Sequence, residues 1–280
     1  MILVIVEQRE GKLNRVSWET LTAGQAIAAD TGWPLEAAVL GGRVGAFAGE
    51  IASKKVAKVY ALENAKLEPY TPDAFVAALK QFIAAKQPKL VLMPHTYQVR
   101  DFVPKLATAM GRTVISDAIG YKKEGEKHVF TRQMFQGKFV ADVSFAGNAP
   151  WFVTFQNGSF RGDKVEAGTS AAPIETVSVD IADSVIRNKP QEVFKEAKQA
   201  VDLTQAEIIV AVGRGIKSRK TSRSRNSWPK RSVESWRRRV RSAIPAGSPW
   251  TARSAPPARP SRPNSTSRSA SPARSSTSSA

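Results

Sequence analysis

The sequence predicts an α/β fold, with a parallel sheet that carries helices on both faces and continues into an antiparallel extension. Three observations lead to this prediction. Short apolar runs rich in β-branched residues alternate with stretches of helical periodicity over about the first 110 residues, a pattern typical of parallel sheets. Residues 90–93 are apolar throughout, as expected of a strand covered on both faces. After residue 113 no helical stretch separates the strand-like runs, which favours antiparallel pairing.

The elements of the alternating region are placed by their end signals. Apolar runs bounded by polar or glycine-rich sequence predict strands at residues 1–7, 35–40, 56–62 and 90–93. Helical periodicity predicts helices at residues 17–32, 44–53, 72–87 and 100–110. Ser17 and Thr71 are residue types that cap helix N-termini, and Pro72 suits the first helical position. Gly32 is expected to end the first of these helices.

The region after residue 113 contains strand-like runs joined by short turns that contain glycine. Strands are predicted there at residues 113–121, 128–135, 138–145 and 151–155. Residues 160–173 are rich in Gly, Ala and Ser and predict a loop, and one more strand is expected at 175–181. The polar residues 184–206 indicate a linker or a short helix. A last strand, at 207–212, runs directly into Gly213.

The composition excludes several kinds of site. The chain has no cysteine, which excludes a disulfide framework, a thiolate metal site and a catalytic thiol, and its two histidines are too few for a multi-histidine metal site. No apolar run approaches the roughly 20 residues that a spanning helix needs. The first strand-like run lacks the basic leader and cleavage site of a secretory signal. We therefore expect a soluble, cytoplasmic protein without a metal site.

The net charge of +18 is distributed unevenly. Residues 219–280 hold 15 of the 42 Lys and Arg residues, and Glu234 is the one acid among them. The same 62 residues hold 17 Ser and 8 Pro but few aliphatic side chains. Such a segment cannot bury enough apolar surface to offset the entropy of ordering it. We expect a disordered, basic tail that follows an ordinary domain.

The glycine-rich turn after the last predicted strand is a candidate cofactor site. Backbone amides of Gly213, Arg214 and Gly215 can approach a phosphate there, and the guanidinium of Arg214 would add a positive charge. An ordinary strand-to-helix turn is the alternative, because Ser218 stands at the third glycine position of the dinucleotide-binding fingerprint.

The two histidines offer little evidence of catalysis. His95 follows the apolar strand at 90–93, and ligands of parallel sheets bind at the carboxyl ends of the strands. No serine or carboxylate stands near it in a recognisable catalytic spacing, so we expect a histidine hydrogen-bonded in a strand-end loop. His128 has charged neighbours, Glu126 and Lys127, and is predicted to lie on the surface. No catalytic residue is predicted.

Several segments, in order, resemble one known family. They are ILVIVE near the N-terminus, LVLMPHTYQVRDFVPKLATAMG, SDAIGY, FTRQMFQGKFVADV, PWFVTFQNGSF and EIIVAVGRGIKS. Together they span residues 1 to about 218, and they resemble the alpha subunit of electron transfer flavoprotein.

The resemblance implies a domain organisation and a function. A nucleotide-binding-like α/β domain would occupy residues 1–182, a linker 183–206, and the start of a second, doubly wound FAD domain 207–218. Arg214 matches the arginine that contacts the flavin nucleotide in the family. The implied protein is an electron carrier rather than an enzyme. It pairs with a beta subunit and passes electrons from flavin-dependent dehydrogenases, as in fatty acid beta-oxidation, to a membrane quinone reductase.

The tail departs from the family pattern, and a shifted reading frame explains the departure. The family's later flavin contacts, an S-R pair, a G-Q-T-V loop and an S-G-A-I-Q-H segment, do not stand in residues 219–280 as written. One nucleotide lost or gained near codons 218–219 would displace the frame. The codons of residues 253–280 then permit the string VGSSGQTVTPELYLALGISGAIQHLVG, which contains two of the missing motifs. We expect electron transfer to be impaired by the loss of most of the FAD domain.

A nucleic-acid-binding protein is the alternative function. An Arg/Ser-rich arm would bind phosphates with strong salt dependence. GC-rich codons read out of frame also yield Arg, Ser, Pro and Ala, so the tail does not by itself predict a specific nucleic-acid partner. A nucleotide-binding enzyme built on residues 1–145 is a third possibility, but no catalytic constellation supports it.

Overall fold

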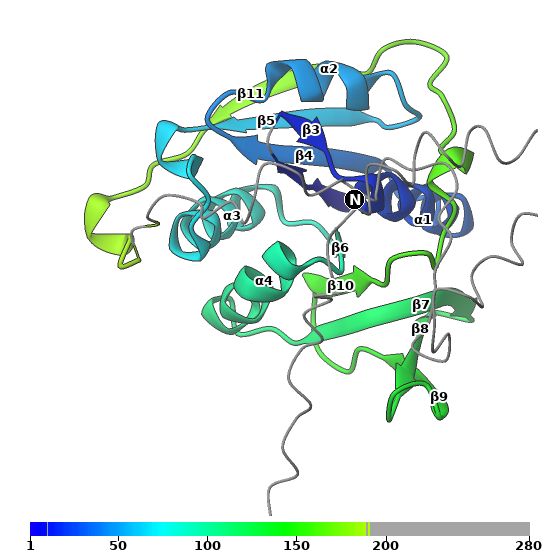
Figure 1. The fold of residues 1–280 in the computed structure, drawn as a ribbon. Helices are drawn as coiled ribbons and strands as arrows, with labels where there is room; N and C mark the ends of the chain where they lie inside the picture. The colour runs from blue at the N-terminus through cyan, green and yellow to red at the C-terminus, as the bar shows by residue number, and fades with distance from the viewer. Residues whose placement is uncertain (10, 189, 191–280) are drawn as a thin grey trace, which may run out of the picture. The chain divides into compact units, whose positions relative to one another are not determined.

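A computed structural model describes residues 1–9, 11–188 and 190 of the chain. One mixed sheet dominates this part, and its strands follow the order β11-β5-β4-β1-β6-β10-β7-β8-β9 (Figure 1). Their bounds are β1 Ile2–Val6, β4 Leu35–Gly41, β5 Lys58–Glu63, β6 Leu90–Pro94, β7 Val114–Glu124, β8 Lys127–Met134, β9 Phe139–Ser144, β10 Trp151–Phe155 and β11 Ile174–Ser178. A separate small hairpin joins β2 Gln8–Arg9 to β3 Lys12–Leu13.

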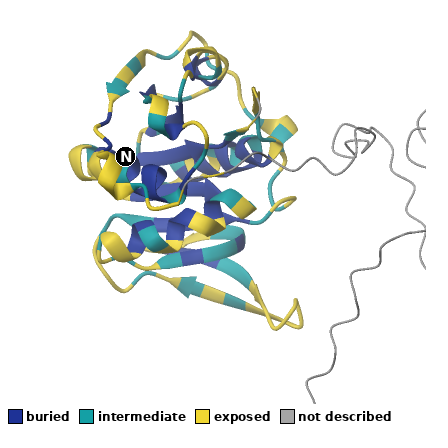
Figure 2. Cartoon of the chain, turned by 60° about the vertical axis from the view of Figure 1, so that its left-hand side comes forward, coloured by how far each residue is buried: buried dark blue, intermediate teal, exposed yellow. Residues whose placement is uncertain are grey.

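Helices cover both faces of the sheet, as the sequence predicts. They are α1 Arg15–Thr31, α2 Gly45–Ala52, α3 Pro72–Lys86 and α4 Tyr97–Ala109, with short 3₁₀ turns η1 Ala65–Leu67, η2 Gly162–Lys164 and η3 Asp183–Val185. The apolar sides of α3 and α4 pack with one face of the central strands, and those of α1 and α2 pack with the other. Figure 2 shows the central strands buried between these two layers.

The parallel part of the sheet confirms the predicted fold class. Every neighbouring pair from β11 to β7 is parallel, while β7–β8 and β8–β9 are antiparallel. The five residues of β1 and of β6 are all buried. Continuous apolar runs are required there, because both faces of these strands lie under helices.

The strand at 151–155 differs from the prediction. It matches β10 in its bounds, but it is not part of the antiparallel extension: it runs parallel to both β6 and β7 and lies between them. The reason is burial on both faces. Phe152, Val153 and Phe155 are almost completely buried and belong to different faces of the core, so an outer position would expose one set. The antiparallel extension consists of β7, β8 and β9.

The N-terminal helix also begins differently from the prediction. Asn14, not Ser17, is its N-cap, and the Asn14 side chain accepts a hydrogen bond from the Val16 amide at 3.1 Å. Ser17 is buried, and its hydroxyl accepts a hydrogen bond from the amide of Glu7 at 2.9 Å. The predicted Thr71 cap and the Gly32 terminus are confirmed, and Gly32 has the left-handed φ of 70° that favours glycine.

Two further elements differ in position. The fourth predicted helix begins earlier, at Tyr97, because the Thr96 side chain caps it by accepting from the Val99 amide. The strand predicted at 175–181 is β11, and it pairs in parallel with β5 at the edge opposite β9. Among the described residues, no helix is both long and apolar enough to cross a membrane.

Candidate functional site

Polar side chains gather where β1, β6 and β10 end. Glu7 follows β1, His95 and Thr96 follow β6, and Gln156 follows β10. These strands are parallel neighbours, so their carboxyl ends share the edge of the sheet at which ligands of such folds bind. The carboxylate of Glu7 accepts hydrogen bonds from the Thr96 hydroxyl and from the Asn14 side chain. This carboxylate therefore ties the start of α4 to the start of α1.

His95 belongs to a second polar group at the same edge. Its Nδ1 lies 2.8 Å from the Thr154 hydroxyl, which also accepts a hydrogen bond from the Asp117 amide at 3.0 Å. The direction of the bond between the hydroxyl and Nδ1 depends on which ring nitrogen carries the proton, because a hydroxyl can both donate and accept. Nε2 faces Asp117 Oδ1 at 3.7 Å. The Gln156 amide also donates to the Asp117 carboxylate.

The predicted strand-end role of His95 is confirmed, but the sequence did not reveal its carboxylate. Asp117 lies on β7, and the insertion of β10 brings it near β6. Its φ of 61° is left-handed, and the ladder between β10 and β7 is irregular there. Burial lowers the pKa of His95, Asp117 opposes this effect, and Arg100 and Arg132 add to it. The lowered pKa favours the neutral imidazole, which shares a hydrogen bond with the Thr154 hydroxyl.

The prediction that His128 lies on the surface is wrong. Its side chain is buried between the rings of Trp33, 4.8 Å away, and Trp151, 5.7 Å away. The Tyr121 hydroxyl lies 3.0 Å from its Nδ1. Side chains alternate between the faces of a strand, so His128 faces the core even though Lys127, next to it, is exposed. Burial lowers the pKa of His128.

The glycine-rich loop before α2 has its own carboxylate at the helix N-terminus. Glu63 Oε1 accepts hydrogen bonds from the amides of Val44 at 2.8 Å and Gly45 at 3.1 Å. A helix N-terminus is the usual place for a phosphate in nucleotide-binding folds. Here a side chain from the end of β5 occupies that place. The described residues therefore do not fit a flavin phosphate at this loop.

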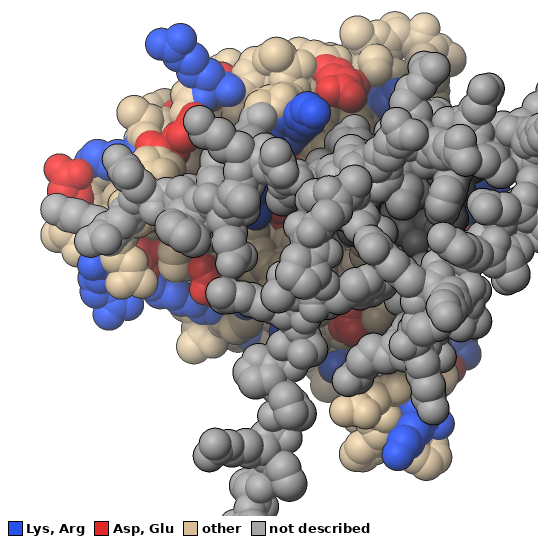
Figure 3. Space-filling view, in the orientation of Figure 1, with Lys and Arg blue, Asp and Glu red and all other residues tan. Residues whose placement is uncertain are grey.

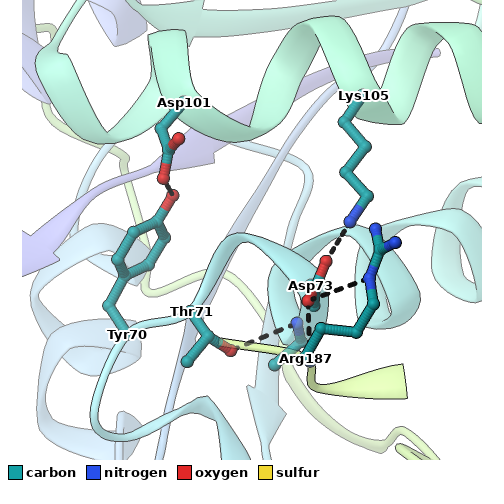
Figure 4. A network of polar contacts seen from close by, with 7 residues as sticks. Tyr70, Thr71, Asp73, Asp101, Lys105 and Arg187 are labelled. Carbon is teal, nitrogen blue, oxygen red and sulfur yellow. Dashed lines mark hydrogen bonds and ion pairs between the residues drawn. The ribbon is translucent and has the colours of Figure 1, made fainter. Parts of the chain in front are cut away.

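A buried aspartate fixes the last described stretch of the chain. Asp73, on α3, pairs with Lys105 of α4 and accepts a hydrogen bond from the Arg187 amide at 2.9 Å (Figure 4). The Arg187 side chain lies 3.9 Å from the same carboxylate. Hydrogen bonds from Lys105 and from the Arg187 backbone lower the pKa of Asp73. Figure 4 also shows the neighbouring bond from the Tyr70 hydroxyl to Asp101, at 2.9 Å.

A surface hollow of about 560 Å³ adjoins this network. It lies between α3 and α4, and alanine and valine side chains form much of its lining. Its polar members Asp73 and Lys105 pair with each other. Because the two charged groups are paired with each other, they are not available to bind a charged ligand. The hollow therefore does not have the polar groups expected of a cofactor site.

The predicted cofactor residues are not among those that the structure describes. Gly213, Arg214 and Gly215 fall outside the described residues, as do most of the predicted linker, the start of the FAD domain and the tail. Within the described part, no group of three or more His, Asp and Glu side chains could hold a metal ion. Figure 3 shows basic and acidic side chains interspersed over the visible described surface.

Comparison with known proteins identifies relatives of the chain. Residues 2–182 match the electron transfer flavoprotein domain family. Over 218 residues the chain is 33% identical to the electron transfer flavoprotein subunit alpha of Bacillus subtilis, a match that covers 78% of this chain and 65% of that protein. It is 30% identical over 220 residues to protein FixB of Clostridium saccharobutylicum, with the same coverage.

A third relative carries a different name. The chain is 28% identical over 240 residues to the acryloyl-CoA reductase electron transfer subunit beta of Anaerotignum propionicum, covering 77% of this chain and 65% of that protein. The chain thus spans 65% of the length of each of these three relatives.

Replacing Asp73 by alanine should release the chain near Arg187. The variant leaves a backbone amide without its acceptor, so we expect the free energy of unfolding to fall by roughly 1–3 kcal/mol. Because the pKa of Asp73 is lowered from 3.8, its contribution is complete above that pH and disappears in stronger acid. The difference between wild type and variant in urea unfolding should therefore shrink as the pH falls below 3.8.

Limited trypsin digestion provides the second readout for this variant. The fragment that ends at Arg187 should form faster from Asp73→Ala than from wild type. Asp101→Ala is the matched control, because this exposed aspartate bonds Tyr70 but not Arg187. Equal rates for the two variants would show that Asp73 does not hold this segment.

Proposed function

Because the chain belongs to the electron transfer flavoprotein family, we propose that it is an alpha-type subunit of an electron carrier that uses a flavin. The family match over residues 2–182 is the observation that carries this proposal. The described domain contributes a scaffold and no catalytic constellation, which suits a carrier subunit in which the cofactor performs the chemistry. The relatives named as subunits of electron transfer proteins support the same role.

We further propose that the flavin is FAD and that its site begins after the described domain. The described glycine-rich loop is occupied by Glu63, so the phosphates require another helix N-terminus. We place the phosphates of the FAD at the turn formed by Gly213, Arg214 and Gly215. The proposed domain boundaries follow residues 182, 206 and 218. The proposed partners are a beta subunit in a heterodimer, flavin-dependent dehydrogenases as electron donors, and a membrane quinone reductase as electron acceptor. We propose that the chain takes part in fatty acid beta-oxidation in the cytoplasm.

We also propose that FAD binding and electron transfer are impaired in this chain. The matches to the relatives cover the N-terminal 78% of the sequence, which ends close to residue 218. The remaining residues carry 15 basic side chains and one acidic one, and their codons permit family motifs in another frame. One Gly-Arg-Gly turn supplies few of the contacts that a ligand of this size needs for affinity.

The visible absorption spectrum tests this proposal. Co-purified with a beta-type subunit, the chain as written should be nearly colourless, while a version with the frame restored after codon 218 should show flavin absorption. Arg214→Ala in the restored version should lower the flavin content severalfold, because it removes a charge-assisted contact to phosphate. Arg43→Ala is the matched control, since Arg43 follows a glycine in the loop that Glu63 occupies. A restored chain without flavin would contradict the proposal.

A nucleic-acid-binding arm is the second function, favoured by the basic residues of 219–280. If it operates, retention of the chain on an RNA column should fall steeply with salt and disappear when residues 219–280 are deleted. Our proposal predicts at most weak retention without sequence preference. Tight, sequence-selective binding by the full chain would favour the second function.

A further inference from the structure

The turn that follows β10 joins an asparagine to a glycine. Asn157 is the one asparagine in the chain that glycine follows, and both residues are exposed. The amide of Ser159 donates to the Gln156 carbonyl at 3.2 Å and closes the turn. Of the two central residues, Gly158 alone has a positive φ, of 84°. A turn with this hydrogen bond and this pattern of φ angles is of type II.

An Asn-Gly sequence contains both groups that a deamidation requires. The backbone nitrogen of the glycine attacks the side-chain carbonyl carbon Cγ of the asparagine. The bond from that nitrogen to Cγ forms, the bond from Cγ to Nδ2 breaks, and ammonia leaves with the amide proton. Water then opens the succinimide at either carbonyl, which gives aspartate or isoaspartate. Glycine favours the attack because it has no side chain and adopts more backbone conformations than other residues.

The surroundings of the turn leave room for this reaction. A Cβ built on Gly158 would meet no atom within 4 Å, so the space beside the attacking residue is open. The exposed side chain of Asn157 is in contact with water, which must open the ring. Asn148 offers an internal comparison, because it is exposed as well but alanine follows it. The turn therefore combines the reactive sequence with an accessible position.

A buried glutamate on α1 holds the attacking nitrogen. Oε2 of Glu19 accepts a hydrogen bond from the Gly158 amide at 2.6 Å, and only 3% of Glu19 is exposed. The second residue of a type II turn has a ψ of about +120°, which directs the next nitrogen away from its side chain. Ring closure needs a rotation about the Cα–C bond of Asn157, and this rotation breaks the bond to Glu19. The negative charge of the carboxylate also opposes loss of the amide proton.

We propose that Asn157 is a site of spontaneous deamidation and that Glu19 slows the reaction by restraining the Gly158 nitrogen. Isoaspartate would place the Cβ atom of residue 157 in the main chain, so the turn would lose its geometry. Gln156, at the start of this turn, donates to the Asp117 carboxylate, and deamidation would therefore loosen the polar group at the sheet edge. The reaction needs only water, so the inference is independent of the proposed function.

Mass spectrometry of the full chain, incubated at neutral pH, tests the inference. Trypsin releases residues 139–161 as one peptide that contains both asparagines. Fragmentation of this peptide should show conversion of amide to acid at Asn157 and little at Asn148. Glu19→Ala should raise the rate at Asn157 by about 10-fold or more, as expected when a hydrogen bond to a charged acceptor no longer opposes opening of the turn.

Thr22→Val is the matched control for this variant. The Thr22 hydroxyl donates to the Arg161 carbonyl at 3.0 Å, so it anchors the same loop to α1 without contacting Gly158. The substitution should change the rate at Asn157 less than about 3-fold, because the bond from Gly158 to Glu19 remains. An unchanged rate at Asn148 in either variant shows that the domain stays folded.

Three results would overturn the inference. Equal rates at Asn157 in wild type and Glu19→Ala would show that the carboxylate does not restrain the nitrogen, and a slower rate in the variant would make it a base that assists the attack. Absence of conversion at Asn157 even in wild type unfolded by urea would remove the site. If Glu19→Ala fails to fold, Glu19→Gln decides: it keeps an acceptor oxygen without the charge and should react about 3-fold faster than wild type, whereas the wild-type rate would contradict the inference.

Discussion

The burial of β10 between β6 and β7 is the constraint on which the rest of this domain depends. The strand is buried on both faces, and it joins the α/β half of the sheet to the antiparallel hairpins. Its Thr154 hydroxyl bonds both His95 and the backbone of Asp117, so the polar group at the sheet edge exists only with this strand in place. The same insertion leaves β8 and β9 at the far edge of the sheet.

The fold follows from local sequence signals more completely than the polar site does. Apolar runs such as residues 90–93 and caps such as Thr71 are local, and they predict the parallel sheet and its helices. The order of strands depends on contacts between residues far apart in sequence, so the place of β10 and the meeting of His95 with Asp117 were not predicted. The burial of His128 was missed because its charged neighbours in sequence, Glu126 and Lys127, do not reveal the rings of Trp33 and Trp151 that cover it.

The domain combines a nucleotide-binding-like fold with a loop that excludes the usual ligand. Glu63 satisfies the α2 amides that would otherwise bind phosphate. A flavin phosphate would therefore need a helix N-terminus other than that of α2. The near balance of charges before residue 219 and the strongly basic composition after it agree with the proposed change of reading frame at that point.

The nucleotide sequence of the gene across codon 218 tests most directly whether the last 62 residues are misphased coding sequence of a flavin-binding domain. The account predicts that removing or adding a single base there opens a frame that encodes VGSSGQTV and, downstream, SGAIQH. A gene in which neither alternative frame encodes these strings would contradict it.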